Sequence, residues 1–344
     1  MGSTTVTDKR ISRRGFIRIT AVAAGIGATA WATRALLDGS SPARVEETRL
    51  LMGSVANLTL LTKDRDLGER ALAATFDAMQ RLESVLSRYL PSSQLSQLNR
   101  TGYLAQADAA LVAVVERAVL HSQLTGGAFD ISVEPVLAAY RQAAEAGKSL
   151  TAGERASLTS LVDYHNLQVE GAALRLTKPG MALTLDGIAK GYVIDQGADS
   201  LRSWGFDQIL VEVGGDLMSG RRVDGDWQIG IRDPRAGADH PWVGVARLAQ
   251  KAMATSGDYM NTFSQDYANH HIIDPRQGVS PAELASATVL APTAMDADAL
   301  STSLLVLGPA QGLALVGTLP GVDALMVGKD QQVHVSSGFN WDPA

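Results

Sequence analysis

The chain contains no cysteine, so neither a disulfide nor a cysteine-ligated metal can contribute to its fold. Only 5% of its 344 residues are aromatic and 19% are charged. The formal net charge is -6, and no basic stripe recurs after the first few dozen residues, which argues against a nucleic-acid-binding protein. Hydrophobic residues, at 46%, suffice for one large core or two modest ones. An anionic ligand must therefore be met locally, by a metal, a helix N-terminus or a single Lys or Arg.

The N-terminal segment has the features of an export signal. Arg13 and Arg14 precede a run of mostly small apolar residues that is too short to span a bilayer, which is typical of a twin-arginine signal. The Ala30-Trp31-Ala32 sequence resembles a signal-peptidase site, and retention of the segment as a membrane anchor is the alternative. We predict a signal over residues 1–38, a polar linker over 39–47, one domain over 48–344, and a periplasmic location.

The order of the expected elements favours an α+β fold. Apolar residues at helical spacing predict helices over residues 67–89 and 109–125, and a glycine turn leads into a third over 187–205. Runs rich in Val, Leu, Ile and Thr predict strands; these include one that crosses Gly53 and others at 181–186 and 270–275. Because helices and strands do not alternate regularly, we expect mixed, largely antiparallel sheets flanked by helices.

A candidate cation site lies on the helix expected after Thr293. Thr293 and Asp296 fit an N-terminal capping box, which explains Asp296 structurally. Asp298 and Thr302 are four residues apart and so share one helix face, where a carboxylate and a hydroxyl could coordinate a hard cation. A solvated helix face explains the same spacing, and the pattern leaves both interpretations open.

Two glycine-containing turns could approach an anion. Gly187 and Lys190 lie between an expected strand and a helix, where a lysine can meet a phosphate, although the spacing is not that of a P-loop. Ser256 and Gly257 lie in a tight turn that could present backbone N–H groups to an anion. An ordinary turn explains each of them as well.

Two adjacent histidines precede an apolar pair and an Asp-Pro turn. In a strand, His270 and His271 would point to opposite faces, so they are not two ligands of one metal and one at most belongs to a site. A hydrogen-bonded structural role is the plainer explanation of a lone histidine, and Asp274 could simply initiate a turn.

Together these loci resemble a known family. In chain order they are MGS at 52–54, LSRYLPSSQLSQLN at 86–99, GGAFD at 126–130, DGIAKGYVID at 186–195, VEVGGDL at 211–217, ATSGDY at 254–259, HHIIDPRQG at 270–278 and DADALST at 296–302. The set resembles the ApbE family, the FAD:protein FMN transferases, over roughly residues 50–310. The resemblance implies an ApbE-like, T-fold-like α+β architecture.

The resemblance also implies an activity and a site. Such enzymes move FMN from FAD to a Ser or Thr hydroxyl of a partner protein through a phosphoester bond, release AMP and require Mg²⁺. By this resemblance His271 is the catalytic base, Asp274 orients the site or fixes its turn, and the metal ligands are Gly187 through its carbonyl, Asp298 and Thr302. The implied FAD contacts are Met52, Tyr89, Ala128, Phe129, Asp130, Thr184, Lys190, Ser256, Gly257, Ile272 and Ile273.

The sequence departs from the family at several of these positions. Thr184 stands where the family often has Asp, and Asp186 stands where Gly or Ser is usual. Gly187 replaces a more common Ala, which a carbonyl ligand tolerates, and Ile131 replaces a usual Pro. The polar FAD contact at position 184 and the shape of the loop near residue 131 are the features that these changes affect.

Two other functions fit the same residues. One is an exported FAD-binding accessory protein that does not transfer FMN, and the other is a Mg²⁺-dependent FAD pyrophosphatase in which water replaces the acceptor hydroxyl. An accessory protein could dispense with His271, Asp298 and Thr302, so the presence of all three favours an enzyme. The expected acceptor is a flavoprotein with a Ser/Thr flavinylation motif, such as a membrane-bound respiratory subunit.

Overall fold

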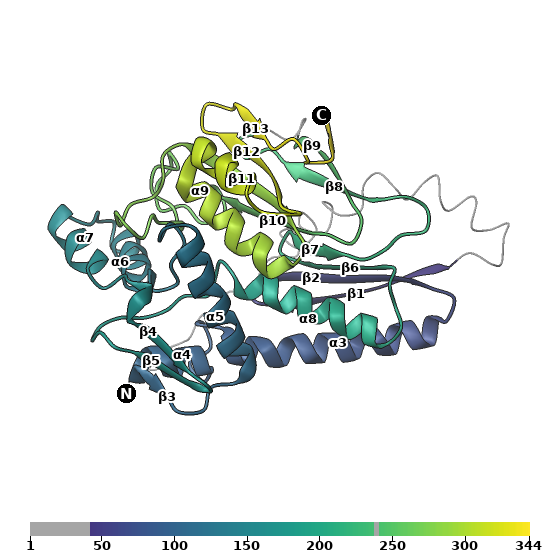
Figure 1. Ribbon diagram of the computed structural model, residues 1–344, viewed down its shortest axis with the longest axis horizontal. Coiled ribbons are helices and arrows are strands. Elements are labelled where there is room, and N and C mark those ends of the chain that lie inside the picture. The colour runs from purple at the N-terminus through teal and green to yellow at the C-terminus, as the bar shows by residue number, and fades with distance from the viewer. Residues whose placement is uncertain (1–41, 237–240) are drawn as a thin grey trace, which may run out of the picture. The chain divides into compact units, whose positions relative to one another are not determined.

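The computed structural model describes residues 42–236 and 241–344; the predicted signal at residues 1–38 lies outside them. Eight strands form one large sheet in the order β1-β2-β6-β7-β10-β11-β12-β13, and neighbours from β2 to β13 pair antiparallel (Figure 1). Their bounds are β1 (Ala43–Leu51), β2 (Ser54–Thr62), β6 (Ile209–Val213), β7 (Asp216–Ser219), β10 (Ala252–Gly257), β11 (Leu284–Ala291), β12 (Asp323–Gly328) and β13 (Val333–Val335).

Two three-stranded antiparallel sheets accompany the large one. The first has the order β14-β9-β8 and the second has the order β3-β5-β4. Their bounds are β3 (Tyr103–Leu104), β4 (Leu167–Glu170), β5 (Ala173–Leu176), β8 (Trp227–Arg232), β9 (Trp242–Leu248) and β14 (Trp341–Pro343). The predicted α+β fold with largely antiparallel sheets is confirmed.

Helices cover the large sheet and pack on one another. α8 packs against both α3 and α9, and α9 lies on β10 and β11 (Figure 1). The bounds are α3 (Arg65–Leu86), α4 (Gln94–Thr101), α5 (Ala109–Leu124), α6 (Glu134–Glu145), α7 (Ala152–Thr159), α8 (Ala189–Ser203) and α9 (Ala294–Val316). The helices predicted over 67–89, 109–125 and 187–205 correspond to α3, α5 and α8.

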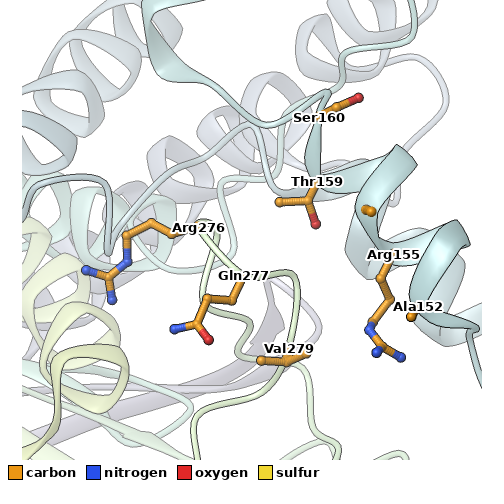
Figure 2. A pocket seen from close by; sticks show the side chains of 8 residues that line it. Ala152, Arg155, Thr159, Ser160, Arg276, Gln277 and Val279 are labelled. Carbon is orange, nitrogen blue, oxygen red and sulfur yellow. The ribbon is translucent and has the colours of Figure 1, made fainter.

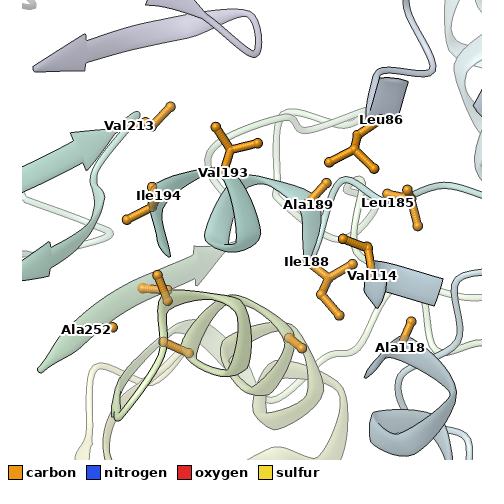
Figure 3. Close-up of a cluster of buried hydrophobic side chains, with 14 of the residues drawn as sticks. Leu86, Val114, Ala118, Leu185, Ile188, Ala189, Val193, Ile194, Val213 and Ala252 are labelled. Carbon is orange, nitrogen blue, oxygen red and sulfur yellow. The ribbon is translucent and has the colours of Figure 1, made fainter. Parts of the chain in front are cut away.

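The core places α8 and α9 very close together. A Cβ atom at Gly191 of α8 would lie 2.2 Å from the carbonyl oxygen of Ala294, so only glycine allows this approach. Within the described residues α9 alone is long and apolar enough to cross a membrane, yet 56% of its most apolar window is buried in the protein. Figure 3 shows the apolar cluster beside α8, which includes Leu86, Val114, Ala118, Leu185, Ile188, Ala189, Val193 and Ile194.

The strand predicted across Gly53 is wrong, because the chain turns there. Met52 and Gly53 have φ angles of 52° and 69°, and they connect β1 to β2. Suitable strand residues continue on both sides of this tight turn, so the pattern did not reveal it. β1 begins at Ala43, which is inside the predicted linker 39–47.

Two further predicted strands are absent from the described residues. In segment 181–186 only Ala182 makes a bridge, a parallel one to Val133. In segment 270–275 only isolated bridges form, from His270 to Thr262 and from Asp274 to Val279. Each segment contains a short run of buried apolar residues, and buried irregular chain gives the same short apolar run as a strand.

Candidate active site

Lys190, in the first turn of α8, lies among buried carboxylates. Its Nζ is 2.7 Å from Asp216 Oδ2, and the Gly191 backbone N–H donates to Asp298 Oδ2 at 3.1 Å. Burial and the neighbouring Asp216 raise the pKa of Asp298. Burial opposes the charge on Lys190, but attraction to Asp216 and Asp298 prevails and raises its pKa. The positive charge of Lys190 therefore lies beside the Asp298 carboxylate, whose ionised form a cation stabilises.

Hydroxyl groups from two elements meet next to the turn that contains Gly187. Thr302 Oγ1 lies 3.1 Å from Ser256 Oγ, which is 2.9 Å from Ser301 Oγ. A Cβ atom on Gly187 would lie 3.0 Å from Thr302 Oγ1, so this turn touches α9 directly. Asp298 is one helical turn before Thr302 and on the same face.

The predicted metal ligands are thus gathered in one region. A carbonyl, a carboxylate and a hydroxyl form an all-oxygen donor set, which suits Mg²⁺ because this hard cation prefers oxygen and keeps several waters. Among the described residues no group of three or more His, Cys, Asp or Glu side chains could hold a metal. A site that uses Gly187 and Thr302 beside Asp298 is consistent with that finding.

His271 is held in one tautomer by a loop carbonyl. Its Nδ1 lies 3.2 Å from the carbonyl oxygen of Asn261, to which its backbone N–H also donates at 2.9 Å. Because a carbonyl only accepts, Nδ1 carries the proton in the neutral ring and Nε2 is an acceptor. Burial lowers the pKa of His271, and the charges of Asp186 and Lys190 act on the same ring. His271 therefore offers a neutral acceptor nitrogen, Nε2, on a ring that the charge of Lys190 also affects.

His270 has a different environment. Its side chain is fully buried, its backbone N–H donates to Ser280 Oγ at 2.9 Å, and burial lowers its pKa to about 4. The rings of His270 and His271 are 6.4 Å apart between centroids and lie edge to face. The prediction that they point to opposite faces of a strand is therefore wrong, since the segment forms only isolated bridges. His270 is buried and His271 is partly exposed.

Asp274 fixes a turn and has no free oxygen. Its Oδ1 accepts from the backbone N–H and Nε of Arg276 at 3.0 and 2.8 Å, and its Oδ2 accepts from Arg276 Nη2 and Gln277 Nε2 at 3.0 and 2.9 Å. A carboxylate bound in this way is a poor proton acceptor, since protonation would break these contacts. The geometry supports the turn-fixing role of Asp274 over a direct catalytic one.

An exposed aromatic ring lies near these charges. Tyr89 is 69% exposed, and the guanidinium of Arg88 lies 4.0 Å from its ring centre. Arg88 Nε also donates to Asp186 Oδ2 at 2.7 Å, and the charge of Asp186 acts on His271. The open face of Tyr89 can therefore stack on a planar ring close to the histidine.

Met52 is held in a left-handed turn next to α3. Its φ angle of 52° is unusual for a residue other than glycine, and its backbone N–H donates to Glu83 Oε1 at 3.0 Å. Strained backbone of this kind persists only where the surrounding structure fixes it, and it is frequent at ligand sites. The position is consistent with the FAD contact predicted for Met52.

Several predicted FAD contacts are buried and engaged within the protein. Asp130 Oδ1 accepts from the backbone N–H and Oγ of Ser132, and its Oδ2 accepts from the Tyr164 backbone N–H at 2.9 Å. Thr184 Oγ1 accepts from the Asp186 backbone N–H at 3.3 Å. The Asp130 carboxylate thus organises its own loop. The other buried members of the predicted set are Ala128, Phe129, Ser256, Gly257, Ile272 and Ile273.

Gly257 is required by the aromatic residue that follows it. A Cβ atom on Gly257 would lie 2.3 Å from the Tyr259 ring, so a larger residue would displace that ring. Ser256, at the end of the same strand, faces the hydroxyl groups of α9. The tight turn predicted at Ser256 and Gly257 is wrong, because both residues lie at the end of β10, where Ser256 is adjacent to the predicted metal ligand Thr302.

Two cavities lie next to the turn that Asp274 fixes. Figure 2 shows a cavity of about 480 Å³ between α7 and the turn at 276–279, lined by Arg155, Thr159, Arg276 and Gln277 among others. A second, of about 250 Å³, lies between residues 274–283 and the middle of α9. Neither cavity is lined by His271, Lys190 or Asp298, so the candidate site is defined by its polar groups.

The sequence did not predict the side chains that hold the start of α9. Thr293 Oγ1 accepts from the Asp296 N–H at 3.1 Å, as expected, but the Asp296 carboxylate binds α5 instead of completing a capping box. Asp195 of α8 also accepts from the N–H groups of Ala294 and Met295 at 2.7 and 2.9 Å. These pairs join residues far apart in the chain, so no local spacing reveals them.

Known proteins share this fold. The apbe protein of Thermotoga maritima has a TM-score of 0.77 at 26% identity, covering 86% of this chain and 97% of that one. The flavin transferase ApbE of Vibrio cholerae has a TM-score of 0.74 at 27% identity, covering 87% and 98%. This likeness in fold and sequence places the chain among the flavin transferases.

Sequence relatives give the family. The model of the ApbE family matches residues 52–326. The FAD:protein FMN transferase of Treponema pallidum is 32% identical over 86% of this chain and 89% of its own length, and one from Vibrio cholerae is 31% identical over 84% and 89%. The chain belongs to the ApbE family, and the resemblance carried by its motifs is confirmed.

Proposed function

We propose that this chain, an FAD:protein FMN transferase by its family and relatives, uses Mg²⁺ to transfer FMN from FAD to a Ser or Thr hydroxyl of a partner protein. The observation that carries the proposal is the gathering of Gly187, Asp298 and Thr302 beside Lys190, with the acceptor nitrogen of His271 nearby. In the reaction the acceptor oxygen bonds to the FMN phosphorus, the pyrophosphate P–O bond breaks, and AMP leaves.

The residues divide the work of phosphoryl transfer, which asks a protein mainly for positioning and electrostatics. Gly187, Asp298 and Thr302 would hold Mg²⁺, which when bound neutralises charge on the pyrophosphate. Lys190 adds a positive charge that Asp216 keeps in place. His271 Nε2 accepts the proton of the acceptor hydroxyl, because its Nδ1 is committed to the carbonyl of Asn261.

The exposed ring of Tyr89 is the proposed contact for the flavin end of FAD. Tyr89 offers one open face while Arg88 covers the other, so its orientation is fixed before a ligand arrives. A pre-oriented ring binds a planar partner at lower entropic cost than a mobile one. Met52, held by Glu83, provides a second contact from the β1–β2 turn.

The location and the acceptor follow from residues 1–38. Arg13 and Arg14 support export through the twin-arginine pathway to the periplasm, and the acceptor would then be an exported or membrane-bound respiratory flavoprotein. Replacing both arginines by lysine should leave precursor in the cytoplasm. Normal export of that variant would contradict the proposed signal.

The proposed FMN transfer is tested by measuring the mass of the acceptor protein. Purified protein incubated with FAD, Mg²⁺ and an acceptor domain should raise the acceptor's mass by one FMN, and a chelator should prevent this. Release of AMP with free FMN and an unmodified acceptor would instead indicate a pyrophosphatase. FAD binding without AMP or transfer, against every acceptor domain offered, would indicate an accessory protein.

A further inference from the structure

Asp296 is bound from α5 by two side chains. Arg117 Nε and Nη2 donate to its two carboxylate oxygens at 2.6 and 2.7 Å, and His121 Nε2 lies 2.9 Å from Oδ1. A two-pronged Arg–carboxylate pair is rigid as well as strong.

Only one ring nitrogen of His121 has a hydrogen-bond partner. Its side chain is 4% exposed, and its Nδ1 is buried with no hydrogen-bond partner among the described residues. A proton on Nδ1 would therefore be a buried donor without an acceptor, which is unfavourable. Nε2 therefore carries a ring proton and donates it to Asp296.

Arg117, His121 and Asp296 form a cluster. This cluster lies next to both parts of the proposed metal centre, the start of α9 and the turn at Gly187. Asp296 lies two residues before Asp298 in the first turns of α9. The ring of His121 packs edge-on against Phe129 at 6.0 Å between centroids, and Phe129 Cε2 would lie 3.4 Å from a Cβ atom on Gly187. A shift of this cluster would therefore move Asp298 and Gly187 relative to each other.

We propose that Asp296, bound by Arg117 and His121, is a positioning residue for the Mg²⁺ centre. It ties the start of α9 to α5 and so fixes where the Asp298 carboxylate meets the carbonyl of Gly187 and the hydroxyl of Thr302. The inference rests on the proposed function, because that function supplies the metal. Groups that orient ligands in this way typically change metal affinity by ten- to hundredfold when replaced.

The test compares Asp296→Asn with wild type in the full chain. The variant keeps the shape of the side chain and loses its charge. We expect the Mg²⁺ concentration for half-maximal FMN transfer to rise about tenfold, with kcat at saturating Mg²⁺ and the Kd for FAD within a fewfold of wild type. The Mg²⁺-dependent rise in melting temperature, measured without acceptor, should move to higher Mg²⁺ by the same factor.

A matched control separates positioning from stability. Asp342→Asn breaks another Asp–Arg pair, with Arg247 on β9, and should leave the Mg²⁺ dependence unchanged. Arg117→Lys keeps the charge but loses the two-pronged contact, so it should give an intermediate shift and serves if Asp296→Asn does not fold. If both cluster variants melt earlier yet keep the wild-type Mg²⁺ dependence, the inference is overturned and the function stands. A wild type without any Mg²⁺ dependence overturns both.

Discussion

The two halves of the candidate site are built differently. The half on α8 and α9 depends on close packing, since Gly191 admits Ala294 at a distance that no side chain allows. The half that contains His271 lies on the connection between β10 and β11, which has isolated bridges but no strand of its own. Close helix packing, together with the contacts of Asp195 and Asp296, fixes the first half, whereas hydrogen bonds and ion pairs of a loop fix the second.

Buried charges anchor the histidine half. Asp258 is fully buried, and Arg235 binds its two carboxylate oxygens at 2.8 and 2.6 Å. Lys329 lies 3.6 Å from the same carboxylate and donates to the carbonyl of Tyr267 at 3.0 Å. These contacts hold the loop whose Asn261 carbonyl orients His271. The candidate site thus combines a closely packed helix pair with a loop that hydrogen bonds and ion pairs keep in place.

The largest effect is expected from the helix half. Asp298→Ala should abolish Mg²⁺-dependent transfer, because it removes the only charged member of the proposed ligand set, while FAD remains bound through its flavin and adenine contacts. Transfer and FAD binding measured side by side provide the check. Asp199→Ala, an exposed carboxylate on α8 paired with Arg202, is the control. Undiminished transfer by Asp298→Ala at ordinary Mg²⁺ would remove this residue from the site.

The histidine half should show a smaller but still large loss. His271→Ala should slow FMN transfer by a factor on the order of 10²–10⁴, the usual cost of losing a general base, with little change in FAD affinity. His270→Ala should be comparatively mild in rate. Single-turnover transfer at saturating FAD and Mg²⁺ distinguishes them. A crippled His270 variant beside an active His271 variant would reverse the assignment.

His270 should instead control stability in acid. Its pKa is about 4 in the folded protein and near 6.5 when unfolded, so the unfolded state binds more protons between these values. Stability from this residue is therefore complete above pH 6.5 and falls as the pH drops toward 4, by up to about 3 kcal/mol. Urea unfolding should show that the free energy of unfolding falls less between pH 7 and pH 4.5 for His270→Gln than for wild type. An equal fall in the free energy of unfolding for both proteins would contradict this role of His270.

The smallest predicted effect concerns packing in the helix half. Gly191→Ala should destabilise the protein by about 1–3 kcal/mol, because the added methyl group meets the Ala294 backbone. Gly153→Ala in α7 is the matched control, since nothing lies within 4 Å of its Cβ position, and it should be neutral or stabilising by up to about 1 kcal/mol. Thermal melting of both variants gives the comparison. Equal melting temperatures would show that the helices can separate without cost.

The sequence correctly predicted the features that follow from a periodic pattern or a motif. The spacing of Asp298 and Thr302 placed both on one helix face, and apolar repeats located α3 and α5. It failed at segments 181–186 and 270–275, where a short buried run reads as a strand although its neighbours leave it irregular. It also missed the contacts of Asp296 with α5, because a pair separated by 179 residues leaves no local pattern.

The central claim is that His271 acts as a neutral base held by a loop carbonyl. Its most direct test is the pH dependence of single-turnover FMN transfer at saturating FAD and Mg²⁺. Because burial lowers the pKa of His271, the wild-type rate should fall in acid along a limb centred below pH 6.5. That limb should be missing from the residual rate of His271→Ala and present in His270→Ala. An unchanged acid limb in His271→Ala would contradict the account.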